Sequence, residues 1–100
     1  MADSTFTLFR GAAATSSTTL YTSPTNMAVA VTNIAIVNDS ASAVTATINL
    51  ATFPIVGGIS VAGNSTQFID LDQIIYNGET ITGSASTTSV NFHIAGYEVY

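Results

Sequence analysis

Residues 27–38, MAVAVTNIAIVN, form an apolar run with no polar face over most of its length. On an extended chain successive side chains point to opposite sides, so Val29 and Val31 share one face while Ala28 and Ala30 share the other. A surface strand of a small domain usually alternates between apolar and polar residues. The run therefore predicts a strand that is covered on both faces.

The sequence allows two explanations of what covers the second face of the strand at 27–38. In the first, Val29 and Val31 pack on the opposite sheet of the same domain, and the flat face of Ala28 and Ala30 lies against a neighbouring subunit. In the second, the run is a central strand buried on both sides within one domain. A chain of 100 residues without a helical apolar stripe has little left to cover both faces, which favours the neighbouring subunit.

The rest of the sequence also predicts strands, because β-branched and aromatic residues dominate it. Expected strands lie at residues 5–10, 19–22, 27–37, 44–50, 59–62, 66–71, 80–85 and 89–99. Turn residues separate them at spacings near ten residues. The pattern predicts an all-β fold, an antiparallel β-sandwich or jelly-roll-like barrel of about eight strands.

Pairing and irregularities can be predicted in part. The strands at 27–37 and 44–50 are joined by a short turn and predict a hairpin. The apolar phase slips by one residue at Thr32–Asn33, and a second slip is expected at Ala95–Gly96 in the last strand. Such slips are typical of β-bulges, at which a strand bends around the corner of a sandwich.

The N-terminal part, residues 1–18, is expected to differ from the β-sandwich domain at residues 19–100. Its apolar residues Phe6, Leu8 and Phe9 precede an uncharged run and fit two descriptions, an arm that docks on a neighbour or an edge strand plus linker. The first residues carry an acid before any apolar run, so no secretory signal is expected.

Charge is scarce in this chain. Charged residues make up 7% of the sequence, against about 25% in an average globular protein, and Arg10 is the only fixed cation at a net charge of −5. Such a chain cannot neutralise phosphates or bind an anionic membrane surface, so neither nucleic acid nor membrane is an expected partner. Threonine and serine supply the polar surface instead, and hydroxyl groups lose less on burial than charges do. This composition favours permanent contact with other subunits.

Residues able to carry catalysis are almost absent. His93 is the only histidine, there is no lysine or cysteine, and no G-x-S-x-G elbow is present. Asp70 and Asp72, with Glu79 nearby, could supply oxygen ligands to Ca²⁺, but two acids on an exposed edge that prevent wrong strand pairing are the stronger interpretation. The sequence predicts a non-enzymatic protein without a cofactor or a resident metal.

Several segments, spanning residues 19–99, resemble short virion structural proteins of tailed bacteriophages. They are LYTSP at 20–24, VAVTNIAIVNDSASAVTATINL at 29–50, GNSTQFIDLDQIIYNGETITGSAS at 63–86 and the closing VNFHIAGYEV. This group includes head decoration (cement) proteins, neck proteins and tail or fibre subunits. The resemblance implies a structural role and brings no catalytic residues with it.

Composition and resemblance together predict a capsid decoration protein on the phage head surface, made in the host cytoplasm. The expected partners are the major capsid protein or other virion subunits, and a homo-oligomer is expected, with a trimer assumed although no residue distinguishes three subunits from two or five. A tail, neck or fibre subunit that binds a host glycan is the alternative. The expected interface residues are Phe6, Leu8, Phe9, Arg10, Ala28 and Ala30.

Overall fold

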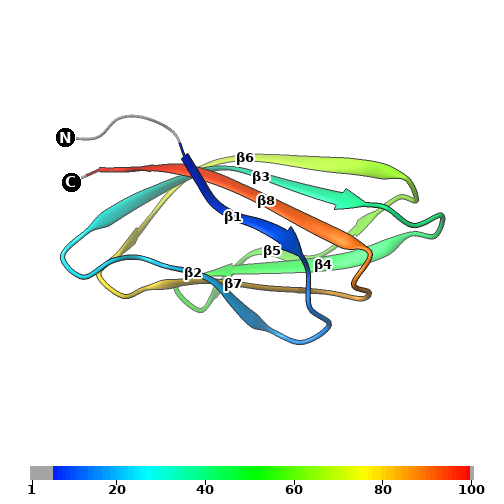
Figure 1. The fold of residues 1–100 in the computed structure, drawn as a ribbon, viewed down its shortest axis with the longest axis horizontal. Helices are drawn as coiled ribbons and strands as arrows, with labels where there is room; N and C mark the ends of the chain where they lie inside the picture. Colours follow the sequence, from blue (N-terminus) through cyan, green and yellow to red (C-terminus); the bar gives the residue numbers. More distant parts are fainter. Residues whose placement is uncertain (1–5, 100) are drawn as a thin grey trace.

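The computed structural model describes residues 6–99, and every regular element in this range is a β-strand. The eight strands are β1 (Phe6–Ala12), β2 (Thr18–Thr22), β3 (Ala28–Asn38), β4 (Val44–Leu50), β5 (Phe53–Val61), β6 (Ser65–Tyr76), β7 (Thr80–Ala85) and β8 (Val90–Glu98). They form an antiparallel β-sandwich, which confirms the predicted fold class (Figure 1).

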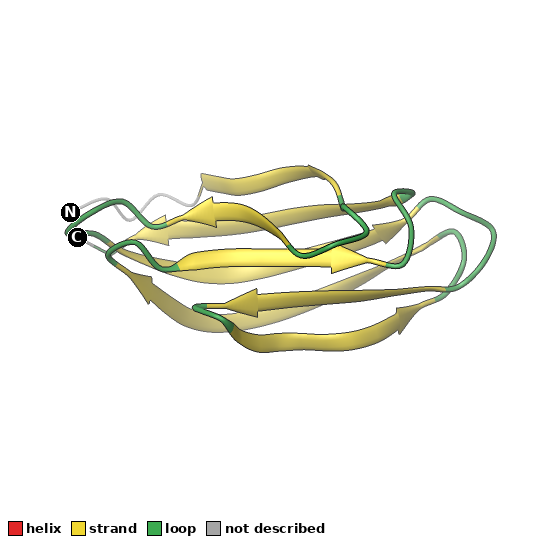
Figure 2. Ribbon diagram, turned by 90° about the horizontal axis from the view of Figure 1, so that it is seen from below, coloured by secondary structure: helices red, strands yellow, loops and turns green. Residues whose placement is uncertain are grey.

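The sandwich consists of two four-stranded sheets. Sheet A has the order β1-β8-β3-β6 and sheet B the order β2-β7-β4-β5, and every neighbouring pair is antiparallel. This is the strand order of a jelly roll, in which two Greek keys wrap around one core. The molecule is elongated, 43 × 23 × 18 Å, with its turns gathered at the two ends (Figure 2).

Consecutive strands mostly cross from one sheet to the other. β3 belongs to sheet A and β4 to sheet B, so the predicted hairpin of 27–37 with 44–50 is wrong. Among residues 6–99 the hydrogen-bonded consecutive pair is β4–β5, joined by the turn at Ala51 and Thr52. Alternation along a strand shows which side chains face the core. It does not show whether the next strand pairs with it in the same sheet or lies in the opposite sheet.

β3 is the central strand of sheet A, and its phase slip is a real bulge. Thr32 is the extra residue between the pairs that Val31 and Asn33 make with β8. The bulge changes the parity of the strand, so that Val31 and Ile34 both face the core and are fully buried. The apolar residues before and after the slip therefore both pack in the core of the sandwich.

β8, by contrast, has no slip at Ala95–Gly96. Its side chains alternate regularly from Val90 to Gly96, and the extra residues lie on its neighbours, at Leu8 in β1 and Thr32 in β3. Gly96 has a different role there. A Cβ at this position would overlap the carbonyl oxygen of Ala30, so β8 can approach the bulge only with glycine.

β5 and β6 are longer than the sequence predicts. β5 begins at Phe53 and includes Pro54, which an edge strand tolerates because one of its N–H groups needs no partner. Its two register shifts opposite β4 leave two extra residues in bulges, Gly58, at φ 72°, and Ile55. β6 has 12 residues and is the edge strand of sheet A.

Residues 6–12 form an edge strand of their own sheet, which was one of the two descriptions expected of this segment. β1 pairs with β8, and Leu8 is buried in the core. The following loop also belongs to the domain, because Ala13 is buried and its N–H donates to the carbonyl oxygen of Val90 at 2.7 Å. The sandwich therefore includes β1 and the connection to β2.

The structure predicts that Gly96→Ala lowers the free energy of unfolding by roughly 1–3 kcal/mol, because the new methyl group must displace β3 or β8. Gly57→Ala is the matched control, since a Cβ there meets nothing within 4 Å. Urea denaturation of both variants measures the difference. Equal midpoints for the two variants would contradict the close approach of β8 to Ala30.

Candidate interaction surface

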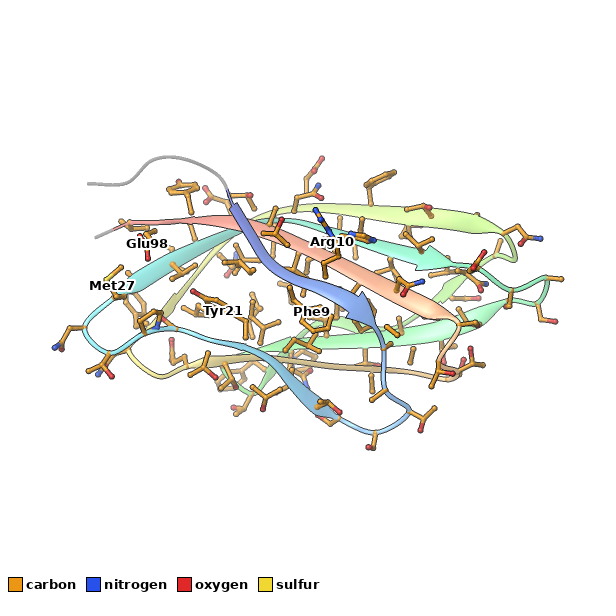
Figure 3. The ribbon with its side chains drawn as sticks, viewed as in Figure 1. Phe9, Arg10, Tyr21, Met27 and Glu98 are labelled. Atoms are coloured by element: carbon orange, nitrogen blue, oxygen red, sulfur yellow. The ribbon has the colours of Figure 1, made fainter. Side chains whose placement is uncertain are left out.

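The sequence-predicted residues of β1 have separate locations. Leu8 faces the core, and Phe9 is half-buried against it. Arg10 is exposed on the outer side of β1, and its Nη2 donates to Thr7 Oγ1 at 3.4 Å (Figure 3). The side chain of Phe6 lies outside the described part of the structure. Of the predicted interface residues in β1, Arg10 is therefore accessible to a partner, whereas Leu8 is buried in the core.

Ala28 and Ala30 lie on the outer face of sheet A, opposite in parity to the core residues of β3, yet each is only 1% exposed. Longer side chains on the flanking strands cover them. Ala30 is paired with Tyr97 of β8 and Ile74 of β6, and Ala28 with Tyr76 of β6. The second face of β3 is therefore covered within one chain, and a partner on this face would touch the flanking side chains rather than the alanine methyl groups.

Large exposed apolar side chains gather on two strands that the sequence analysis did not single out. Phe53 is 73% exposed and Phe68 is 65% exposed. The full set is Phe53, Ile55, Phe68, Ile74 and Tyr76. All belong to β5 and β6, which lie near one another at the open edges of sheets B and A. We call this side of the molecule the β5–β6 edge.

A groove of about 390 Å³ runs along one part of this edge. β5 contributes Phe53 and Ile55, and β6 contributes Ile74 and Tyr76. Polar groups join them at Gln73 and Glu79. Glu79 is held in place, because its Oε1 accepts from the backbone N–H of Tyr76 at 2.8 Å. The groove is thus mainly apolar and aromatic, with a fixed carboxylate at its margin.

The turn beside the groove has a strained backbone. Ala51 and Thr52, which join β4 to β5, have φ values of 50° and 70°. A two-residue hairpin turn with both φ values positive normally uses Asn-Gly, and a β-branched residue in this region is an outlier. Backbone strain of this kind is found most often at functional sites, such as ligand-binding sites. Here it accompanies the exposure of Phe53, the next residue along the chain.

A signal for the β5–β6 edge exists in the sequence. In TQFIDLDQIIY, Phe68, Ile74 and Tyr76 share the parity of Asp70 and Asp72, while Ile69 and Leu71 are on the other parity. The strand is therefore apolar on both faces near its ends, as residues 27–38 are. The sequence could not show that β6 lies at an edge, where no neighbouring side chains cover the outer residues.

The titratable residues form no metal-binding cluster in the part of the chain that the structure describes. Among residues 6–99, no group of three or more His, Cys, Asp or Glu side chains could hold a metal ion. Asp70 Oδ1 instead accepts from Asn33 Nδ2 at 2.9 Å across β3 and β6. His93 lies on the outer face of sheet A, paired with Arg10. The region from residue 6 to residue 99 contains no candidate for a membrane-spanning helix.

Among the titratable residues that the structure describes, Tyr21 is the one whose pKa is clearly shifted. It is half-buried on β2, in the space between β2 and β1 (Figure 3). Burial raises the pKa of Tyr21 above 10.0, and the negative charge of Glu98 raises it further. Both effects favour the neutral phenol, so this side of the sandwich is closed by a side chain that resists ionisation.

We expect replacement of Ala51–Thr52 by Asn-Gly to raise the free energy of unfolding by about 1–2 kcal/mol, because both residues tolerate a positive φ. The matched control makes the same change at Ala14–Thr15, a loop without positive φ, where glycine only adds freedom to the unfolded chain. Thermal or urea unfolding compares the two. A stabilised control with an unchanged turn variant would contradict the strained hairpin.

The raised pKa of Tyr21 also predicts a pH dependence. Because the folded state favours the neutral phenol, the stabilisation is complete below pH 10 and is lost as the pH rises toward the folded-state pKa. In Tyr21→Phe this alkaline loss is reduced, and one ionisation above pH 10 disappears from the ultraviolet titration. Glu98→Gln should lower the pKa of Tyr21 only partly, since burial is the larger cause. A tyrosine titration that is identical in wild type and Tyr21→Phe above pH 10 would exclude this assignment.

Comparison with known proteins does not assign the chain to a family: no family model matches it, and a search of curated proteins finds no match. The features of the chain that bear on its function are therefore the fold, the composition and the β5–β6 edge.

Proposed function

We propose that this protein is a non-enzymatic structural subunit of a bacteriophage virion, a capsid decoration (cement) protein that stabilises the head by bridging shell subunits. The observation that carries the proposal is the β5–β6 edge. Four of its five exposed apolar side chains line the groove, and contiguous apolar surface on a small domain marks a site of interaction. An isolated monomer would leave Phe53 and Phe68 mostly in water.

The polar surface is also suited to permanent contact. The outer face of sheet B carries mainly hydroxyl and amide groups, among them Thr45, Thr47, Asn49, Thr82 and Ser84. Their strands place the core residues on alternate positions, as the burial of Ile48 and Ile81 shows. Hydroxyl groups that find hydrogen-bond partners lose little on desolvation, whereas charges lose much. A surface of this kind can be buried against another subunit at low cost.

The fold is compatible with this role without deciding it. Jelly rolls serve as viral capsid domains and as lectin domains, among other uses. Fold alone therefore leaves several functions open. Support for the virion comes from the sequence pattern of residues 19–99, which resembles phage structural proteins, together with the scarcity of charge.

One observation favours the second candidate, a tail, neck or fibre subunit that binds a host glycan. The groove combines the aromatic rings of Phe53 and Tyr76 with the polar groups of Gln73 and Glu79. Its volume of about 390 Å³ falls in the range of small-molecule sites. Aromatic rings beside fixed polar groups could hold one sugar unit. Host surface polysaccharide added to the isolated protein would then quench or shift tyrosine fluorescence, and Tyr76→Ala would abolish this response.

The first test is the copy number of the 10.3 kDa chain relative to the main shell protein in purified particles of the phage that encodes it. A decoration protein should approach one copy per shell subunit, or one per few. Particles depleted of the chain should lose their DNA at a lower temperature, and adding the protein back should restore the original temperature. A few to some dozens of copies would favour the tail or fibre candidate, and absence from particles would exclude a virion role.

A second measurement connects this role to the β5–β6 edge. We expect Phe53→Ser to fold normally, because the side chain is mostly exposed, but to rebind depleted particles at least ten times more weakly. Thr45→Ser, on the outer face of sheet B, is the control for a general effect of surface substitution. Equal rebinding of the two variants would remove Phe53 from the contact with the shell.

A further inference from the structure

Sheet A ends in two strands with free backbone edges. Within residues 6–99, β1 pairs only with β8 and β6 pairs only with β3. Both strands therefore have one side whose N–H and C=O groups have no strand partner, and such an edge can accept another strand. The three antiparallel steps from β1 through β8 and β3 to β6 make β1 and β6 run in opposite directions. A second copy placed beside the first would thus bring β1 next to β6 in antiparallel orientation.

The two edges carry opposite charges. Arg10, the only fixed cation of the chain, is exposed on β1, and Asp70 and Asp72 are exposed on β6. A two-fold pairing of β6 with β6 centred on Leu71 would place Asp70 opposite Asp72, and a pairing of β1 with β1 centred on Arg10 would place two guanidinium groups together. Like charges directly opposite one another destabilise a strand pair. The charges therefore select the pairing of unlike edges.

The registers of the two edges also agree. Three of the rows of paired residues across sheet A bear on the joint. They are Thr7–Ala95–Asn33–Asp70, Phe9–Ile94–Ile34–Ile69 and Arg10–His93–Ala35–Phe68. If the sheet continues into the next copy without a shift, Arg10 lies opposite Phe68 and Phe9 lies opposite Ile69. Residues 9–12 and 66–69 are regular in both strands, since the bulges lie outside them.

In this register Arg10 of one copy lies close to both Asp70 and Phe68 of the next. The Arg10 guanidinium already leans along β1 toward Thr7, so it would extend toward the row of Asp70. The Asp70 carboxylate is held on the outer face by Asn33. The guanidinium and its alkyl stem would cover the exposed ring of Phe68, a favourable arrangement of a cation on an aromatic face.

On the inner side, Phe9 and Ile69 are both half-buried against the core at their respective edges. Direct opposition would remove the remaining exposed surface of both side chains from water, which is favourable. The same register thus satisfies a charge pair on one face and an apolar pair on the other.

We propose that copies of this protein associate head to tail, with the β1 edge of one subunit extending sheet A of the next at β6, and with Arg10 bound to Asp70 across the joint. Each subunit uses two different edges in such an interface, so association closes into a ring or continues as a filament. The inference does not depend on the proposed virion role, because it concerns the isolated protein.

The test is a charge exchange, read out as molar mass by light scattering and as β-sheet content by circular dichroism. The wild type should exceed 10.3 kDa and dissociate as salt is raised. Arg10→Asp alone and Asp70→Arg alone should each fold but associate on the order of 100-fold more weakly. The double variant R10D/D70R should associate again. An equimolar mixture of the single variants should also associate, with the two variants alternating, because the altered edge of each variant complements the altered edge of the other.

Asp39→Arg is the matched control, since it makes the same change of net charge as Asp70→Arg at an exposed turn near the first residues of β6, outside the Arg10–Asp70 pair, and should leave association unchanged. Asp70→Asn keeps a hydrogen-bond acceptor for Asn33 and should weaken association without affecting the fold. A wild type that stays monomeric at millimolar concentration overturns the proposal, as do single charge reversals that associate like the wild type. If the wild-type protein self-associates as expected but is absent from purified particles, only the proposed function is contradicted.

Discussion

The change of parity at Thr32 is the constraint on which the sandwich depends. β3 runs through the middle of sheet A for 11 residues, and a regular strand would turn either its first or its second apolar set away from the core. The bulge lets Val31 and Ile34 face the same side. Its geometry requires glycine at position 96 of β8, and an extra residue at Leu8 in β1 keeps that strand in step. The bulge in β3 is thus accompanied by a required glycine in β8 and by a second bulge in β1.

A sandwich without helices can cover its core but cannot cover both of its open sides. On the side of β1 and β2, the half-buried Phe9, Leu20 and Tyr21 pack against the core. On the opposite side, Phe53 extends into solvent at the groove, and Phe68 is exposed farther along β6. This asymmetry gives the chain one closed side and one apolar side that is available for contact. Thr and Ser supply most of the polar groups, and the charges beside the apolar side are all acidic, at Asp70, Asp72 and Glu79.

The sequence predicts the strands well because alternation is local, and β4 and β7 begin and end where the pattern places them. It does not predict which sheet a strand joins, since inward-facing residues of β3 and β4 look the same whether the strands pair or face one another. The one hairpin between residues 6 and 99, β4–β5, is missed because its turn, Ala51–Thr52, lacks the Asn-Gly signature, while the Asn77–Gly78 turn connects different sheets. The exposed residues of β6 are missed for a related reason, because exposure depends on the position of the strand at an edge.

Scarcity of charge gives the few charges of this chain unusual weight. Hydroxyl groups donate and accept alike, so a surface of Thr and Ser can pair with many partners but cannot distinguish one orientation from another. Direction must come from groups that carry a sign. Arg10 stands at one edge of sheet A and Asp70 at the other, both at positions where their surroundings restrict them. Opposite signs on opposite edges oppose two-fold pairing and allow the sheet to continue in one sense only. Apolar area can supply the affinity of such an assembly, while three or four charged side chains are enough to determine its polarity.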